Sequence, residues 1–343
     1  MDLEALNDVA TRMVAPGQGI LAADESTGTI KKRFDTIGLE STETNRRDWR
    51  EMLFRTAPAM KDHISGVILY DETIRQKSDD GTTLVKLIED AGAVPGIKVD
   101  TGAKDLALSP GEKVTEGLDG LRERLKEYYE LGARFAKWRA VIDIGRGGDE
   151  AIPSQYCIDV NVHALARYAA LCQEAGIVPI VEPEVLMDGD HSIERCYEVT
   201  EFTLKALYRE LFEQNVQLEG TILKPNMVIA GQKCSDQASV DEVADMTVQC
   251  LANCVPAAVP GIAFLSGGQS DLQATAHLNA MNSSYDLPWP LTFSYGRALQ
   301  AAPLKAWGKA MDVKAGQKAF NHRANMNGLA ALGEWTEALE GGK

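Results

Sequence analysis

The chain has 343 residues, of which 45% are hydrophobic and 25% charged, and its 35 Lys and Arg against 50 Asp and Glu give a formal net charge of −15. A chain of this length and composition folds into a globular protein that buries roughly three quarters of its unfolded surface. Because its average field repels nucleic acid and anionic membranes, we expect neither as a partner. An anionic ligand would therefore need a local basic pocket.

The N-terminal residues contain neither the basic nor the apolar segment of an export signal, and the apolar runs are too short to span a membrane. The six cysteines form no C-x-x-C pair, which indicates reduced thiols and a cytoplasmic location. Cys250 and Cys254 are spaced to share a helix face as metal ligands, but core packing is the favoured interpretation. The five histidines show no ligand spacing, so we expect no metal and no cofactor.

Eight short segments rich in apolar, β-branched or aromatic residues predict buried strands. They are residues 19–24, 66–71, 96–100, 135–144, 177–184, 220–226, 261–268 and 291–297. Segments of helical length separate them, and Ser239-x-x-Glu242 predicts a capping box at the start of one helix. Residues 1–18 predict a covering helix, and residues 299–343 predict C-terminal helices followed by a tail.

Eight alternating strand and helix segments favour a closed parallel (β/α)8 barrel, the TIM barrel of the α/β class, over an open doubly wound sheet. The nucleotide-binding patterns G-x-G-x-x-G and G-x-x-x-x-G-K, which are typical of open sheets, do not occur in the sequence. No linker or low-complexity segment divides the chain. We therefore expect a single domain over residues 1–343, with its strands within residues 19–298.

Charged residues interrupt several of the predicted strands. Lys137 and Arg139 alternate in one strand and Glu182 and Glu184 in the next, so each pair shares one strand face. Three more charges lie within or at the ends of other strands: Asp24, Lys98 and Lys224. In a barrel, the inward C-terminal ends of the strands face one pocket, where these charges would converge.

Burial of so many ionisable groups is costly unless they pair and act, so the cluster indicates catalysis. The alternative is an internal salt-bridge network that only fixes strand register, but such a network does not need three lysines on separate strands. A lysine surrounded by other cations loses proton affinity, and its neutral amine can attack a carbonyl to form a Schiff base. The spacing leaves open whether Lys137 or Lys224 is this nucleophile.

Two polar clusters are candidates for binding phosphate groups. Ser266-Gly267-Gly268 ends the seventh predicted strand and Ser294-Tyr295-Gly296-Arg297 ends the eighth, where barrels commonly bind phosphate. The second cluster follows the first strand and consists of Ser26, Thr29, Lys32 and Arg33. The two clusters would hold phosphates at opposite ends of a substrate. The alternatives are a tight glycine turn for the first cluster and a helix N-cap with a solvated face for the second.

Seven segments carry a resemblance to a known family: Gly-Ile-Leu-Ala-Ala-Asp-Glu-Ser-Thr-Gly (19–28), Gly-Ile-Lys-Val-Asp (96–100), Phe-Ala-Lys-Trp-Arg (135–139), Ile-Val-Pro-Ile-Val-Glu-Pro-Glu (177–184), Leu-Lys-Pro-Asn-Met (223–227), Phe-Leu-Ser-Gly-Gly-Gln-Ser (264–270) and Thr-Phe-Ser-Tyr-Gly-Arg-Ala-Leu-Gln (292–300). In this order they are similar to class I fructose-1,6-bisphosphate aldolases, the Schiff-base, metal-independent family. The resemblance implies a cytoplasmic homotetramer that reversibly splits fructose 1,6-bisphosphate into dihydroxyacetone phosphate and glyceraldehyde 3-phosphate in glycolysis and gluconeogenesis.

The resemblance also implies a role for each residue. Lys224 would form the Schiff base, and Glu182 would be the general acid/base that removes water from the carbinolamine and handles the C4 hydroxyl proton. Glu184 would be hydrogen-bonded near the lysines, Lys137 would supply positive charge, and Asp24 would orient the C4 hydroxyl during C3–C4 cleavage. One phosphate would contact Ser266, Gly267, Gly268, Ser294, Gly296 and Arg297, and the other would contact Ser26, Thr29, Arg33, Lys98 and Arg139.

Two more features bear on the resemblance. Arg46, in Asn-Arg-Arg, matches a family arginine near the substrate. Many members carry a terminal tyrosine that helps to exchange the enamine proton, whereas no tyrosine follows Tyr295 in this sequence. We therefore expect a different or slower proton transfer, and the preference between fructose 1,6-bisphosphate and fructose 1-phosphate stays open.

Two other functions compete with the aldolase. One is a different Schiff-base lyase or a transaldolase acting on another sugar phosphate, which the presence of both phosphate clusters disfavours. The other is a non-catalytic binding protein that keeps the barrel as a scaffold. The intact set of Lys224, Glu182 and Asp24 argues against that as the main role.

Overall fold

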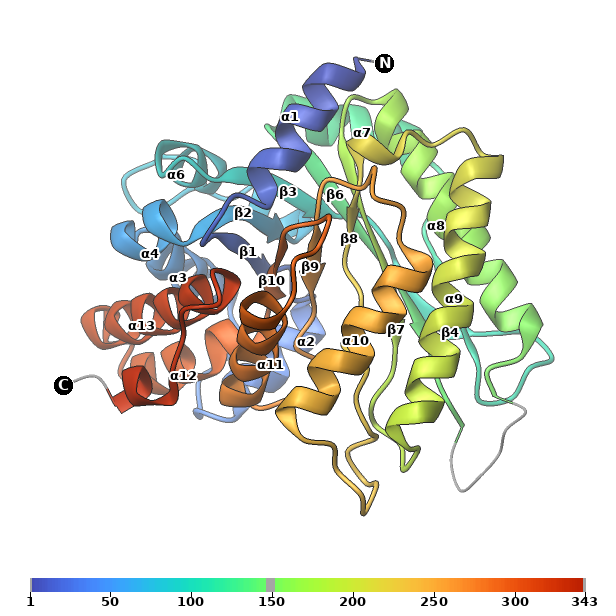
Figure 1. Ribbon diagram of the computed structural model, residues 1–343. Helices are drawn as coiled ribbons and strands as arrows, with labels where there is room; N and C mark the ends of the chain where they lie inside the picture. The colour runs from blue at the N-terminus through green and yellow to red at the C-terminus, as the bar shows by residue number, and fades with distance from the viewer. Residues whose placement is uncertain (1, 146–151, 342–343) are drawn as a thin grey trace.

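The computed structural model describes residues 2–145 and 152–341, and these residues form a closed barrel of eight parallel strands surrounded by helices (Figure 1). The barrel strands are β1 (Gly19–Ala23), β2 (Ile64–Leu69), β3 (Val94–Lys98), β6 (Phe135–Ile142), β7 (Val178–Val185), β8 (Ile222–Leu223), β9 (Ile262–Phe264) and β10 (Leu291–Tyr295). Each strand overlaps one of the eight predicted segments, and β1 pairs with β10 to close the barrel. The predicted TIM barrel is therefore confirmed.

Helices cover the outside of the barrel and one of its ends. They are α1 (Leu3–Met13), α2 (Thr27–Asp35), α3 (Glu43–Phe54), α4 (Ala57–Asp62), α5 (Asp71–Ile74), α6 (Leu84–Asp90), α7 (Leu121–Glu130), α8 (Gln155–Glu174), α9 (Ile193–Glu213), α10 (Val240–Cys254), α11 (Asp271–Ser284), α12 (Arg297–Trp307) and α13 (Val313–Ala331), with short 3₁₀ turns η1 (Leu218–Gly220) and η2 (Glu337–Gly341). Serine or threonine hydroxyls cap several N-termini, as helix starts require. Ser239 accepts a hydrogen bond from the Glu242 backbone N–H, which is one half of the capping box predicted there, and both halves of a capping box form at Ser270 and Gln273.

The interior of the barrel is apolar at the end where the strands begin. The predicted N-terminal helix, α1, lies across this end and buries Leu6, Ala10 and Met13 (Figure 1). These side chains pack with Ile20, Ala22, Ile68, Val94, Phe135, Val178, Ile180, Ile222 and Ala263 from the strands. Together they form a plug of side chains that leaves the other end of the interior for the site.

A second layer of the core lies between the strands and the outer helices. Trp138 of β6 illustrates it, because its ring points outward and packs on Tyr168 of α8 with ring centroids 5.6 Å apart. At the C-terminal side, Trp307 of α12 packs on Phe34 and Trp49. The predicted C-terminal helices are thus α12 and α13, and the last two residues of the predicted tail lie outside the described residues.

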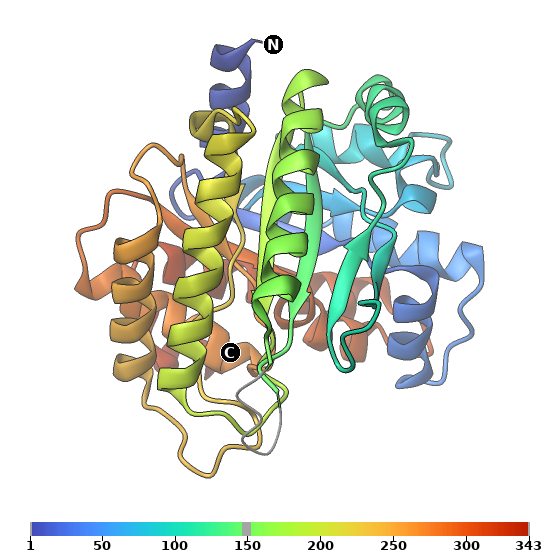
Figure 2. The same ribbon diagram turned by 90° about the vertical axis from the view of Figure 1, so that its right-hand side faces the viewer.

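One antiparallel hairpin stands outside the barrel and was not predicted. It consists of β4 (Gly102–Asp105) and β5 (Lys113–Glu116), and it packs beside β6 and α8 (Figure 2). The Asn161 amide of α8 fixes it by donating to the Lys113 carbonyl oxygen at 2.8 Å. Most of its side chains are exposed or half-buried, so it lacks the apolar run that marked the other strands. In the part of the chain that the structure describes, no helix combines the length and hydropathy needed to cross a membrane.

Candidate active site

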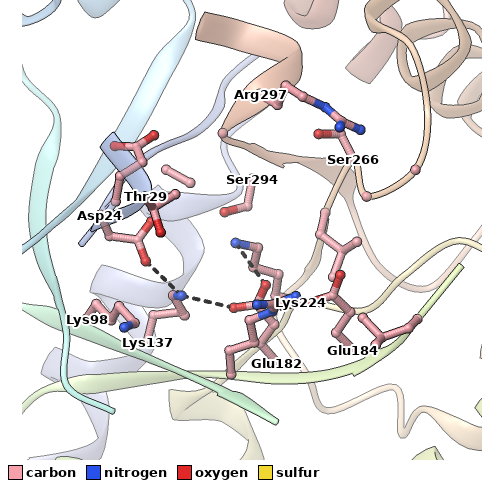
Figure 3. A pocket seen from close by; sticks show the side chains of 18 of the residues that line it. Asp24, Thr29, Lys98, Lys137, Glu182, Glu184, Lys224, Ser266, Ser294 and Arg297 are labelled. Carbon is pink, nitrogen blue, oxygen red and sulfur yellow. Dashed lines mark hydrogen bonds and ion pairs between the residues drawn. The ribbon is translucent and has the colours of Figure 1, made fainter. Parts of the chain in front are cut away.

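A cavity of about 550 Å³ opens at the end of the barrel where the strands finish. Of the residues that the resemblance assigns to the site, all except Arg46 line it, whereas Lys32 of the second polar cluster does not. The catalytic candidates among them are Asp24, Lys137, Glu182, Glu184 and Lys224 (Figure 3). The barrel therefore brings together catalytic candidates that are up to 200 positions apart in the chain (Asp24 and Lys224).

The strand geometry explains why these side chains meet. On β6, Lys137 and Arg139 face the cavity while Trp138 between them faces α8. In the parallel register of β6 and β7, Arg139 lies opposite Glu182, which brings cations and carboxylates onto neighbouring positions. Lys224 directly follows the two-residue strand β8 and is anchored by its backbone N–H, which donates to the Val181 carbonyl oxygen at 2.9 Å.

One carboxylate is shared between two lysines at the base of the cavity. The Glu182 Oε1 atom lies 3.2 Å from Lys224 Nζ, and Glu182 Oε2 lies 3.3 Å from Lys137 Nζ (Figure 3). Lys137 Nζ also lies 2.7 Å from Asp24 Oδ2. The side chains of Lys137, Glu182 and Lys224 are each at most 5% exposed, so these charges interact with little screening by water.

The buried charges shift the pKa values of their neighbours. Burial alone would raise the pKa values of Asp24 and Glu182, but the charges of Lys137 and Lys224 outweigh it and lower both pKa values. Burial alone would lower the pKa of Lys137, but the charges of Asp24 and Glu182 outweigh it and raise the pKa of Lys137 well above its usual value. Lys137 is therefore an ammonium group and the two carboxylates are ionised near neutral pH.

Further cations line the wall of the cavity above this centre. Glu184 forms an ion pair with Arg139 of the neighbouring strand, so its contact is with an arginine rather than with either catalytic lysine candidate. Lys98 at the end of β3 lies 3.2 Å from Asp100. These basic side chains make the local positive pocket that an anionic ligand of an acidic protein requires.

The first predicted phosphate cluster occupies the loops after β9 and β10. Gly268 has φ +74°, and a Cβ atom on it would lie 2.2 Å from Met187 Cγ, so the turn accepts only glycine there. The Ser294 hydroxyl oxygen is buried and has no hydrogen-bond partner among the described residues. Arg297 lies at the start of α12 and also lines the cavity. Backbone N–H groups, a hydroxyl and a guanidinium are the donors that a phosphate group needs.

The second cluster lies at the start of α2. Ser26 is the N-cap of this helix, and its hydroxyl accepts a hydrogen bond from the Thr29 backbone N–H. This agrees with the alternative interpretation of the cluster, in which Ser26 caps a helix. Arg33 forms an ion pair with the buried carboxylate of Glu25. A Cβ atom on Gly296 would lie 3.6 Å from the Arg33 guanidinium, so this arginine lies beside the first cluster. The remaining residues predicted for the second phosphate also line the cavity: Ser26, Thr29, Lys98 and Arg139.

Arg46 is the predicted site residue that the structure places elsewhere. Its guanidinium binds both carboxylate oxygens of Glu72 of α5, at 2.8 and 2.6 Å, and donates to the Ser41 carbonyl oxygen. The side chain is buried in this arrangement and does not line the cavity. The geometry therefore gives no support to a substrate contact by Arg46.

Sequence reasoning missed several residues of the cavity wall. They are Ala22, Glu25, Leu186, Met187, Asp188, Gln232 and Leu265. For Glu25, position gave a signal, because it directly follows Asp24 at the end of a strand. For Gln232 the sequence held none, since it belongs to the long irregular segment between β8 and α10.

Comparisons with known proteins identify a family for the whole chain. The family model described as fructose-bisphosphate aldolase class-I matches residues 5–343. A probable fructose-bisphosphate aldolase class 1 of Xanthomonas campestris is 63% identical over 337 residues, covering 98% of this chain and 99% of that protein. Fructose-bisphosphate aldolase C of Carassius auratus is 53% identical, covering 97% and 91% of the two chains.

A solved structure of an aldolase has the same fold as this chain. Fructose-bisphosphate aldolase from Plasmodium falciparum, crystallised with TRAP and a small-molecule inhibitor, superimposes with a TM-score of 0.94 at 47% identity. The match covers 97% of this chain and 96% of that one. The family model, the relatives and the shared barrel lead to one conclusion: this protein belongs to the class I fructose-bisphosphate aldolase family and is a lyase.

Proposed function

We propose that the protein reversibly cleaves fructose 1,6-bisphosphate to dihydroxyacetone phosphate and glyceraldehyde 3-phosphate through a Schiff base on Lys224. The observation that carries this proposal is the Glu182 carboxylate shared between Lys137 and Lys224 beneath a cavity with phosphate-binding donors. Membership of the aldolase family supports the substrate and a place in glycolysis and gluconeogenesis.

The contacts of the two lysines favour Lys224 as the nucleophile. Lys137 lies within 3.3 Å of two carboxylates, those of Asp24 and Glu182, and its raised pKa keeps it charged and unreactive. Lys224 lies 3.2 Å from the single carboxylate oxygen Glu182 Oε1, which is placed to take a proton from it. The choice that the sequence left open thus falls on Lys224, with Lys137 as a fixed positive charge.

The proposed reaction assigns one task to each group. The neutral Lys224 amine attacks the C2 carbonyl, and Glu182 donates the proton that lets the carbinolamine hydroxyl leave as water. Asp24, ionised beside Lys137, orients the C4 hydroxyl, and Glu182, deprotonated again after the loss of water, accepts the C4 hydroxyl proton as the C3–C4 bond breaks. The bonding electrons move into the iminium to give an enamine, and the aldehyde product leaves. Protonation of the enamine at C3 and hydrolysis of the imine release dihydroxyacetone phosphate.

The remaining cavity residues would hold the substrate. Ser294, Arg297 and the turn at residues 266–268 supply donors for one phosphate, while the residues after β1 and the cations Lys98 and Arg139 supply donors for the other. Because the iminium is itself the electron sink, the proposed chemistry requires no metal. The cytoplasmic location and the homotetramer are proposed from the family resemblance.

Borohydride trapping tests this proposal. The protein is incubated with dihydroxyacetone phosphate, reduced and digested, and the mass adduct is located by peptide mass spectrometry. We expect the adduct on Lys224 in the natural sequence and in a Lys137→Met variant, and its loss in Lys224→Met. An adduct on Lys137 would move the covalent role to that residue. A folded protein that gives no adduct would support the scaffold or a different ketose.

A further inference from the structure

Gln269 is the last residue of the turn that follows β9, and it is buried between the two parts of the first phosphate cluster, residues 266–268 and residues 294–297. Its backbone N–H donates to the Ser266 carbonyl oxygen at 3.2 Å and thereby closes the turn at residues 266–269. Its carbonyl oxygen accepts a hydrogen bond from Arg297 Nη2 at 3.3 Å. Any displacement of Gln269 therefore moves both the turn and the guanidinium that face the cavity.

The side chain of Gln269 is fixed by a histidine. Gln269 Oε1 lies 2.6 Å from Nδ1 of His277 on α11, and both residues are only 5% exposed. The amide nitrogen of Gln269 is buried and has no partner among the described residues. The contact with His277 is thus the hydrogen bond through which the described structure holds this side chain in place.

The protonation state of His277 suits this contact. Burial lowers the pKa of His277 to about 4, so the ring is neutral near pH 7. With an amide oxygen facing it, Nδ1 carries the proton and donates the hydrogen bond. The ring itself is held by α11, a 14-residue helix that begins directly after the turn with a complete capping box.

We infer that His277 is a positioning residue for phosphate binding: through Gln269 it fixes the turn at residues 266–269 and aligns Arg297 with the cavity. The inference rests on the proposed function, since it concerns the same phosphate group of the substrate. A second hydrogen bond to the same turn supports it, because Gln232 Nε2 donates to the Gly268 carbonyl oxygen at 2.7 Å. His277 and Gln232 thus hold adjacent residues of one turn from different parts of the fold. Such fixed donors let a site bind an anion without ordering the loop at the same time.

The test removes the donor and then restores it. His277→Leu deletes the N–H while it keeps a branched side chain of similar reach, and His277→Asn places an amide nitrogen close to the position of Nδ1. For His277→Leu we expect KM for fructose 1,6-bisphosphate and the inhibition constant of inorganic phosphate to rise together by about tenfold, with kcat within about threefold. We expect His277→Asn to bring both constants back to within about threefold of the natural protein.

The control replaces another histidine that forms a hydrogen bond. His163 of α8 contacts Glu210 away from the cavity, and His163→Leu should leave both constants unchanged. If His277→Leu lowers the melting temperature but changes neither constant, the role is structural and the inference is wrong. It is equally wrong if KM rises while the phosphate inhibition constant does not.

The same variants separate this inference from the proposed function. If the natural protein does not cleave fructose 1,6-bisphosphate, the proposed function fails. Calorimetric titration with inorganic phosphate then still tests His277, because it needs no turnover. A dissociation constant for phosphate that is equal in the natural protein and in His277→Leu would overturn the inference on its own.

Discussion

The two halves of the barrel interior use the same strands for opposite purposes. Along the eight residues of β7, the inward side chains change from Val178 and Ile180 in the apolar plug to Glu182 and Glu184 in the cavity wall. The neighbouring strands change in the same direction, from Phe135 to Lys137 on β6 and from Ile222 of β8 to Lys224 directly after that strand.

This difference shows how the fold tolerates its buried charges. Each ion removed from water costs several kcal/mol before it finds a partner. Lys137, Glu182 and Asp24 recover part of that cost through mutual ion pairs, while the side chains of the apolar plug contribute burial without polar groups to desolvate. Variants in the two halves should therefore separate stability from chemistry. We expect the largest effects on catalysis from the charged half and the largest effects on the free energy of unfolding from the apolar half.

The largest effect is expected in the charged half. Lys224→Met removes the amine that forms the proposed Schiff base, and we expect kcat to fall on the order of 10⁴-fold. The fold should persist, because Glu182 retains its contact with Lys137 and the backbone anchor of residue 224 to Val181 does not involve the side chain. Steady-state kinetics and circular dichroism measure the two properties.

A matched variant sharpens this result. Lys205→Met changes a lysine on α9 that is 56% exposed and pairs with Glu201, so kcat should stay within about twofold. Turnover by Lys224→Met at more than a tenth of the natural rate would contradict a covalent role for this lysine.

The next effect is expected in the apolar half. Phe135 is fully buried, and its ring fills the space above Gly96, where an added Cβ would lie 2.3 Å from it. Phe135→Ala opens a cavity in the plug and should lower the free energy of unfolding by about 3–5 kcal/mol, as measured by urea denaturation. The exposed Phe212 on α9 provides the control, and Phe212→Ala should change the free energy of unfolding by less than about 0.5 kcal/mol. A loss of less than 1 kcal/mol on Phe135→Ala would show that the plug does not stabilise the barrel as argued.

The contrast between the halves also explains which features the sequence predicted. A strand that is buried on both faces reads as an apolar run, and a charge inside such a run is conspicuous, so the barrel and residues such as Lys137 and Glu182 could be predicted. The outer hairpin at β4 and β5 is largely exposed and carries no such run. Pattern alone therefore gave no reason to expect it.

Contacts between side chains on different elements could not be predicted in the same way. The direction in which the Arg46 side chain points depends on Glu72 of α5, 26 residues later in the chain. The spacing of residues along the helix of Arg46 does not reveal that partner. His277 reaches Gln269 only because the chain turns sharply before α11. Such contacts depend on loop conformation, for which hydrophobic period carries no information.

The smallest expected effect is a change in how the free energy of unfolding depends on pH, and it concerns Asp24 in the charged half. The pKa of Asp24 is lower in the folded protein than in an unfolded chain, where it is about 3.9, so unfolding takes up a proton as the pH falls below about 5. The stabilisation is therefore complete above pH 5 and is lost at lower pH, at a slope of at most about 1.4 kcal/mol per pH unit for one carboxylate. Asp24→Asn should flatten the dependence of unfolding free energy on pH between 5 and 3, measured by urea denaturation at each pH. The exposed Asp236, replaced in the same way, should leave that slope as it is. An equal slope in Asp24→Asn and the natural protein would mean that the ion pair between Asp24 and Lys137 contributes no acid-sensitive stability, and that the other ion pairs of the charged half, such as Lys137 with Glu182, hold Lys137 in place without it.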